Sequence, residues 1–147
     1  MLFYSLRVIL SDIPLKFTVV QLDYFTYLCL VDKKRELFFF KEYFREFYQQ
    51  QTWKVQKKIL WTLQIVESID RIPEIYFKHL ENTDALYEIR VQVGNDIFRI
   101  FCFFDNNNLV VVGHGFQKKA QKTPAKEIER AEKIKKEYYE EKKSNKP

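Results

Sequence analysis

The 147-residue chain has few of the residue types on which common metal and redox sites depend. It contains two cysteines, two histidines and three glycines. The cysteines, Cys29 and Cys102, form neither a disulfide framework nor a zinc-binding pattern. No motif typical of zinc sites, of nucleoside-triphosphate binding or of a Ser-His-Asp triad occurs. The sequence therefore favours chemistry without a metal or cofactor, and its cysteine usage fits the reducing cytoplasm.

A long uninterrupted hydrophobic run is also absent, even in the apolar first thirty residues. Asp12, Lys16 and Asp23 interrupt every window there that is long enough to span a bilayer. The early positive charge, the uninterrupted apolar stretch and the small-residue cleavage site of a signal peptide are not convincing here. We therefore expect no membrane partner. Residues 1–30 are expected to be either upstream sequence, with the natural start near Val31, or an extra strand or two packed on the sheet.

The rest of the composition indicates one folded domain with an anionic partner. Hydrophobic residues make up 46% of the chain and aromatic residues 17%, which excludes a disordered chain. We expect a single domain over residues 31–143 and a disordered tail over residues 144–147. The formal net charge of +5 favours an anionic partner, nucleic acid first.

The hydrophobic pattern predicts an α+β domain with the order β-α-α-β-β-β-α. Thr52 is expected to cap the second helix, and Gly94-Asn95 marks a tight turn between two strands. Thr123 is expected to cap the final helix, with Pro124 at its first position. Val55, Ile59, Leu63, Val66 and Ile69 form one apolar stripe of the second helix, and Cys102 is expected to be buried. The predicted strands are 36–40, 85–93, 96–104 and 109–115, and the predicted helices are 41–51, 52–70 and one from 124 onward.

The strand register predicts a row of cationic side chains. If the turns are symmetric about 94–95 and 106–107, Arg90 faces Arg99, and Arg99 faces His114, all on one face of the sheet. Like charges placed directly opposite are destabilising, so such a row is expected where an anion binds. Two alternatives remain open. Glu88, Asp96 or an acidic residue of the last helix neutralises the arginines, or a bulge shifts the register.

The segment after the last predicted strand adds further cationic groups. Gly113 and Gly115 flank His114, which allows a close approach of the backbone to a ligand. Phe116 is a candidate for stacking on a base, and lysines follow just before the last helix. A lysine-rich loop is by itself more often simply solvated. Together with the arginines, however, these residues form a candidate phosphate site, with the lysines Lys118, Lys119 and Lys122 and, more weakly, Lys78 and His79.

The second half of the sequence resembles a known toxin superfamily. "ALYEIRVQVGNDIFRIFCFF" followed by "LVVVGHGFQKKAQKTPAKEIERAEKIKKEYY" is similar to the RelE/HigB superfamily of bacterial type II toxin–antitoxin systems, particularly its phage-derived HigB-like branch. The resemblance covers about residues 33–140. It implies a compact sheet with two helices on one side and one on the other. It also implies an mRNA endoribonuclease, or mRNA interferase, usually acting on the ribosome, and a helix-turn-helix antitoxin as partner.

The resemblance also implies roles for individual residues. Arg90 and Arg99 would bind and stabilise the scissile phosphate, the loop lysines would contact further phosphates, and Phe116 would pack against a base. His114 is a candidate for proton transfer, with Tyr138 or Tyr139 as alternatives. Cleavage would proceed by attack of the RNA 2′-hydroxyl without a metal. Two other functions remain open: a toxin of the same fold that inhibits DNA gyrase, and an RNA-binding module without catalytic activity.

Overall fold

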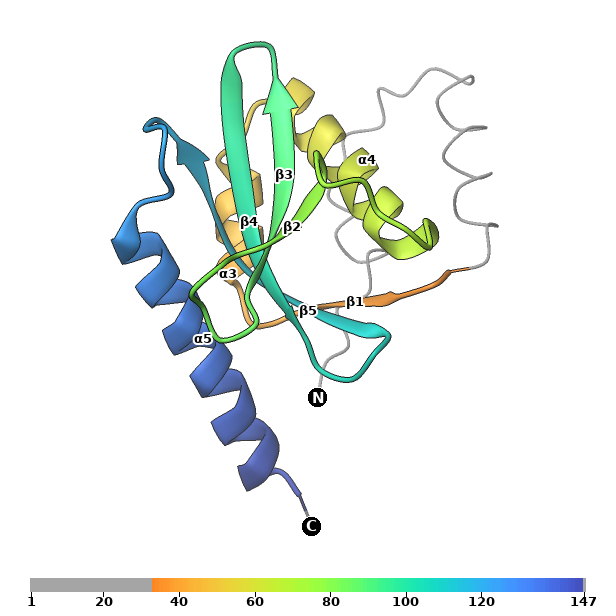
Figure 1. Ribbon diagram of the computed structural model, residues 1–147, viewed down its shortest axis with the longest axis vertical. Helices are drawn as coiled ribbons and strands as arrows, with labels where there is room; N and C mark the ends of the chain where they lie inside the picture. The colour runs from red at the N-terminus through yellow and green to blue at the C-terminus, as the bar shows by residue number, and fades with distance from the viewer. Residues whose placement is uncertain (1–32, 147) are drawn as a thin grey trace.

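The computed structural model describes residues 33–146, so the expectations for residues 1–30 lie outside the described part of the chain (Figure 1). A single five-stranded sheet has the strand order β1-β5-β4-β3-β2. Strand β1 runs parallel to β5, and the other neighbours are antiparallel. The elements are β1 (Glu36–Phe39), α3 (Tyr43–Gln49), α4 (Trp53–Ser68), β2 (Phe77–His79), β3 (Tyr87–Val93), β4 (Asp96–Phe104), β5 (Leu109–Lys118) and α5 (Ala125–Ser144).

The α+β class and the order of the predicted elements are confirmed, with one additional strand. β2 has three residues and pairs with the first half of β3, and it was missed because such a short segment has no readable periodicity. β5 extends three residues beyond its predicted end. α5 begins at Ala125 with Pro124 as its N-cap, so the expected start is wrong by one residue.

Helices α3 and α4 cover one face of the sheet and enclose the larger core with it (Figure 1). Val55, Ile59, Leu63 and Val66 of the predicted stripe are buried, and so is Cys102 of β4. Ile69 is exposed, because α4 ends at Ser68. Burial raises the pKa of the Cys102 thiol, which therefore stays protonated. Stripes of this kind supply most of a helix's stability through packing.

Helix α5 covers only part of the opposite face (Figure 1). Ala131, Ile134 and Tyr138 pack in a second core cluster with Phe101 and Phe103, among others. The Tyr138 hydroxyl donates a hydrogen bond of 2.6 Å to Asp105, to which Lys142 also binds. These contacts place α5 over the β4–β5 turn and leave the β3–β4 turn uncovered. Across residues 33–146, no helix is long and apolar enough to cross a membrane.

A bulge in β5 changes the predicted register. Arg90 pairs with Arg99, as predicted from the Gly94-Asn95 turn, in which Gly94 has a φ of +59°. The next pairing is wrong, because Arg99 pairs with Phe116 and not with His114. The β4–β5 turn pairs Phe104 with Val110, which shifts the expected register by one residue. Between Ile100 and Cys102 the register shifts by one more, where two residues of β5 stand opposite one of β4.

The two glycines beside the bulge provide a test of this packing. A Cβ atom at Gly115 would lie 2.4 Å from Cδ1 of the buried Phe47 ring, whereas one at Gly113 would meet its nearest neighbours at 3.5 Å. We expect Gly115→Ala to lower the free energy of unfolding by about 1–3 kcal/mol through overpacking. Gly113→Ala is the matched control and should change it much less. Urea denaturation measures both, and equal stability of the two variants would contradict the described packing.

Candidate functional site

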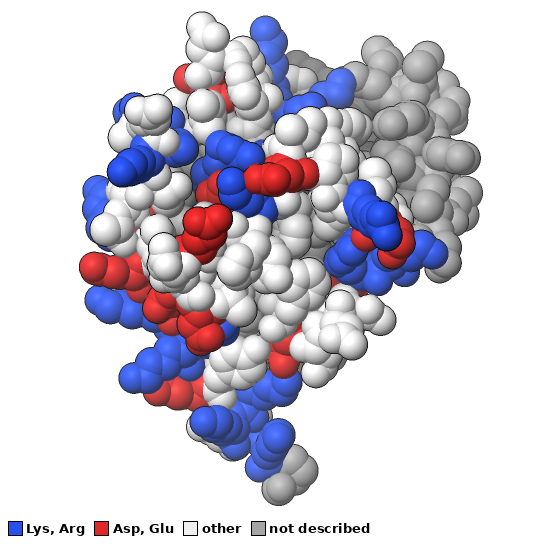
Figure 2. Space-filling view, viewed as in Figure 1, with Lys and Arg blue, Asp and Glu red and all other residues white. Residues whose placement is uncertain are grey.

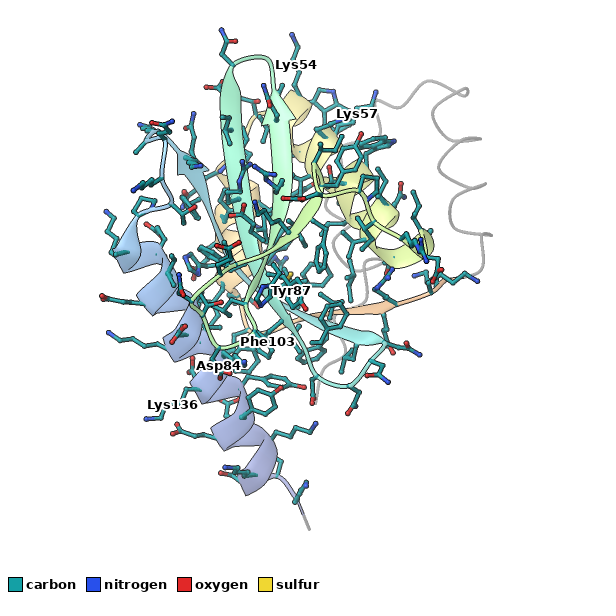
Figure 3. The ribbon with its side chains drawn as sticks, in the orientation of Figure 1. Lys54, Lys57, Asp84, Tyr87, Phe103 and Lys136 are labelled. Carbon is teal, nitrogen blue, oxygen red and sulfur yellow. The ribbon has the colours of Figure 1, made fainter. Side chains whose placement is uncertain are left out.

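Two arginines stand directly opposite each other where α5 leaves the sheet uncovered. Arg90 of β3 and Arg99 of β4 form a cross-strand pair, and their side chains therefore point to the same face. The Arg99 side chain is 7% exposed and the Arg90 side chain 28%. Lys and Arg side chains gather near the β3–β4 end of the molecule, with a few acidic ones among them (Figure 2). Lys54 and Lys57 of α4 also lie toward this end (Figure 3).

A single buried carboxylate joins the two arginines. Oε1 of Glu88 lies 3.4 Å from Nε of Arg90 and 3.4 Å from Nε of Arg99. The neutralising residue is therefore Glu88, one of the alternatives considered above. Asp96 binds Gln117 instead, and Glu127 of α5 binds His114. One carboxylate against two guanidinium groups leaves the cluster positive.

Lys118, at the end of β5, adds a third cation to this cluster. Burial lowers the pKa of Lys118, and the positive charges of Arg99 and Arg90 lower it further, whereas Glu88 raises it. Burial also lowers the pKa of Arg99, although a guanidinium stays charged in proteins. Each of these charged forms is destabilised by burial or by its cationic neighbours. A bound anion would favour the charged forms, because a nearby opposite charge offsets the destabilisation from both sources.

A pocket of about 450 Å³ opens beside the arginine pair at the edge of β3. β2 begins at Phe77, opposite Ile89, and the residues just before it, Ile75 and Tyr76, form one wall of the pocket. The Arg90 main-chain N–H donates to the Tyr76 carbonyl at 2.8 Å, and its guanidinium donates to the Glu74 carbonyl at 3.2 Å. The arginine therefore holds the pocket wall in place as well as lining the pocket. The lining residues are Lys58, Ile75, Tyr76, Arg90, Val91, Gln92, Gly94 and Arg99.

The other predicted phosphate-binding residues are placed less closely together. Lys78 shares the face of the arginines through its pairing with Glu88, and it forms a 2.9 Å ion pair with Glu74. Lys119 and Lys122 lie exposed in the loop between β5 and α5. Phe116 is half-buried and stacks on Phe101 with 5.4 Å between ring centroids. Their roles in phosphate and base binding stay predictions.

His114 is separated from the arginine row by the β5 bulge. The residue is 1% exposed, its Nε2 lies 2.9 Å from Oε2 of Glu127, and its ring packs on Phe101. Burial lowers its pKa, against the effect of the Glu127 hydrogen bond, which raises it. A buried imidazole against a helix has no open side for a substrate. The structure therefore does not bring His114 to the phosphate-binding groups.

The alternative tyrosines lie at the opposite end of the sheet. Tyr138 binds Asp105, and the Tyr139 hydroxyl donates to the Phe104 carbonyl at 3.3 Å. Arg99 lies five residues before Phe104 on β4, which corresponds to about 17 Å along a strand. Burial raises the pKa of both tyrosines. Within residues 33–146, no group of three or more His, Cys, Asp or Glu side chains is placed to hold a metal ion.

The shared carboxylate can be tested through stability. Glu88→Gln should lower the free energy of unfolding by about 3 kcal/mol, because it leaves the buried guanidinium of Arg99 and the partly exposed one of Arg90 without the carboxylate that they share. Added sulfate should then stabilise this variant more than the wild type, because a bound anion offsets the positive charge of the two arginines that Glu88 no longer compensates. Glu74→Gln is the control, since its exposed ion pair with Lys78 contributes little. Urea denaturation with and without sulfate measures the effect, and an equal response of Glu88→Gln and wild type would contradict it.

The buried histidine predicts a pH dependence of stability. Because burial lowers the pKa of His114 below its ordinary 6.5, the unfolded chain takes up the proton first as the pH falls. Stability should therefore decrease as the pH drops through about 6.5 toward the lower pKa of the folded state. His114→Gln should show a smaller loss over the same range. Thermal denaturation at several pH values checks this, and identical pH profiles would show that His114 contributes nothing.

The comparisons with known proteins agree with this fold. The comparison with curated proteins returns no match. Residues 43–136 match a family described as phage-derived Gp49-like protein, and this range runs from the start of α3 into α5. That family lies within the RelE/HigB-like toxin superfamily and is consistent with the toxin of a toxin–antitoxin pair. The match spans well over half of the chain, and the chain belongs to the phage-derived Gp49-like family.

Proposed function

We propose that the chain is the toxin of a type II toxin–antitoxin pair and cleaves mRNA as a metal-independent endoribonuclease. The observation that carries this proposal is the pair Arg90 and Arg99, which lines an open pocket near Lys118 and shares the carboxylate of Glu88. A positive cluster of this kind on a folded β-sheet suits a phosphodiester, because guanidinium groups bind phosphate oxygens with two parallel hydrogen bonds. Family membership supports the same assignment.

The reaction needs neither a metal nor a cofactor, because the RNA supplies its own nucleophile. The 2′-oxygen of the RNA attacks the adjacent phosphorus, the bond from phosphorus to the 5′-oxygen breaks, and a 2′,3′-cyclic phosphate forms. The 2′-hydroxyl loses its proton to water, and the departing 5′-oxygen takes a proton from water. Negative charge builds up on the non-bridging oxygens of the pentacoordinate phosphorus, where Arg99 and Arg90 would stabilise it. Prearranged charges of this kind are often the largest single contribution to catalysis.

Rigid placement of Arg99 supports a catalytic rather than a purely binding role. Its guanidinium donates a 2.9 Å hydrogen bond to the Phe98 carbonyl and contacts Glu88, so its orientation is set before a ligand arrives. Lys118 adds charge at the same place, and the exposed Lys119 and Lys122 would contact neighbouring phosphates. His114 is buried against Glu127. The proposal therefore rests on charge stabilisation and assigns no general base.

The partners follow from the same proposal. The substrate would be mRNA engaged on the ribosome, and the toxin would be neutralised by a helix-turn-helix antitoxin encoded beside it. An exposed positive surface would guide the chain to RNA at a rate and affinity that depend strongly on salt.

Substitution of Arg99 tests the proposed reaction. Arg99→Ala should lower the cleavage rate about 100- to 1,000-fold, the usual effect of removing one group that stabilises transition-state charge. Arg130→Ala, which removes an exposed arginine of α5, is the control and should cleave like the wild type. Inducible expression followed by primer extension on cellular mRNA measures new ends within translated regions. Circular dichroism confirms that each variant is folded, and Arg90→Ala serves as a second variant.

Three results would separate this proposal from its alternatives. Growth arrest without new RNA ends would indicate a toxin that inhibits gyrase. RNA binding without arrest or cleavage would indicate a non-catalytic RNA-binding module. Products with a 2′,3′-cyclic phosphate would support attack by the 2′-hydroxyl, whereas products with a 3′-hydroxyl and a 5′-phosphate would contradict it.

A further inference from the structure

The pocket at the edge of β3 extends beyond what a phosphate alone would occupy. Its volume of about 450 Å³ lies within the range of about 300–1,000 Å³ typical of small-molecule sites. The arginines occupy one part of it, and Ile75 and Tyr76 line another. We propose that this pocket binds the base of the nucleotide whose phosphate rests on Arg90 and Arg99. The inference rests on the proposed cleavage of RNA and adds a base-binding subsite to it.

The aromatic wall is held in a fixed position. The Tyr76 carbonyl accepts from Arg90, and the Tyr76 N–H donates to the Pro73 carbonyl at 2.9 Å. The Tyr76 ring packs at 80° to Trp61 with 5.4 Å between centroids, and Lys58 lies 3.8 Å above the Trp61 ring. A ring supported in this way loses little freedom when a base stacks on it. Stacking of a base on an aromatic side chain contributes about 1–3 kcal/mol.

Ile75 is the most exposed of the large hydrophobic side chains in the described part of the chain, at 65%. It lies beside Tyr76 on the pocket wall, next to charged groups that would otherwise favour only a polar ligand. An exposed apolar side chain beside an aromatic ring provides a surface for the flat face of a base. Phe116, the aromatic residue expected from the sequence, is instead stacked on Phe101 and packed against the second core cluster.

The free edge of β3 supplies hydrogen-bonding groups for the rim of a base. The main-chain N–H of Arg90 points toward the β2 side, where it bonds Tyr76. In an antiparallel strand the main-chain N–H and C=O groups of successive residues point to alternate sides. Those of Gln92 therefore point to the same side as those of Arg90, at a position that β2, which begins at Phe77, does not reach. The Gln92 side-chain amide N–H donates to the Gly94 carbonyl at 3.1 Å, which leaves its oxygen as an acceptor. The exocyclic amino group of a base is the matching donor.

Charge and shape together indicate a nucleotide. The Arg99 side chain is almost fully buried with its Nε facing Glu88, and it lines the pocket together with the more exposed Arg90. A ligand with an anionic group at one end and a flat polar ring at the other would satisfy both parts of the pocket. An acidic peptide would match the arginines but would leave the edge of β3 and the Tyr76 ring without a specific partner.

The test removes the base and its stacking partner separately and together. A 2′-O-methyl RNA trinucleotide, which cannot be cleaved by 2′-hydroxyl attack, is titrated into the full chain, together with versions that lack one base each. Removal of one particular base should weaken binding roughly 5- to 150-fold, which corresponds to the stacking energy above. Tyr76→Ala should weaken binding of the intact RNA to a similar extent, and loss of that base should then have no further effect. Tyr76→Phe should bind like the wild type.

The controls distinguish a failure of the base-binding subsite from a failure of the proposed function. Tyr43→Ala changes an aromatic residue of α3 that binds Glu137 of α5, near the β1 edge of the sheet and away from the β3 edge, and should bind like the wild type. Arg99→Ala should weaken binding of the intact and base-free RNA alike. If Tyr76→Ala does not fold, Gln92→Ala replaces it, and its loss of affinity should likewise vanish when that base is absent.

Three outcomes would overturn the inference. If the RNA binds in an Arg99-dependent way but no base removal weakens it, the base-binding subsite is wrong and the phosphate site stands. If the RNA does not bind the wild-type chain at all, both the subsite and the proposed function fail. The pocket would instead be assigned to a protein partner if an acidic peptide displaced the RNA, if this displacement required Tyr76, and if no base removal weakened RNA binding.

Discussion

The arrangement of the site depends on one carboxylate shared by two guanidinium groups. Glu88 lies two residues before Arg90 on the same face of β3, and Arg99 lies opposite Arg90 on β4. Without the carboxylate, two like charges would be forced together inside the structure, which is unfavourable both electrostatically and through desolvation. With it, the arginines are oriented and still carry more positive charge than Glu88 cancels. The pair is therefore stable enough to fold and remains attractive to an anion.

The distribution of helices over the sheet decides where this charge is accessible. One face is covered by α3 and α4. On the other face, α5 is fixed toward the β4–β5 turn by Tyr138, Asp105 and Lys142, and by the contact between Glu127 and His114. The aromatic side chains of this face, Phe101 and Phe103, lie in the core that α5 covers, whereas the charged ones lie beyond it. The same strands thus carry core side chains at one end and the side chains of the candidate ligand site at the other.

The sequence predicts those features that depend on neighbouring residues along the chain. The stripe of α4 follows from its periodicity, and the opposition of Arg90 and Arg99 follows from a two-residue turn that sets the register of its hairpin. The position of His114 could not be predicted, because the β5 bulge depends on contacts across the fold. Gly115 must accommodate the Phe47 ring, and His114 must reach Glu127 of α5. The wall formed by Tyr76 was missed for a similar reason, since a residue between elements carries no periodic signal.

The bulge also separates two roles that the sequence placed in one row. A histidine directly opposite Arg99 would have been a third cationic group at low pH. In the fold, His114 instead joins β5 to the first turn of α5, and Phe116 takes the place opposite Arg99. The charge of the site is therefore carried mainly by arginines, whose guanidinium groups stay charged in proteins, while the imidazole, whose pKa burial lowers, is enclosed in the scaffold. A change of pH acts on the attachment of α5 to the sheet before it acts on the charge of the anion site. The pH dependence of stability and the binding of an anion are for this reason controlled by different residues, although these residues lie in one sheet.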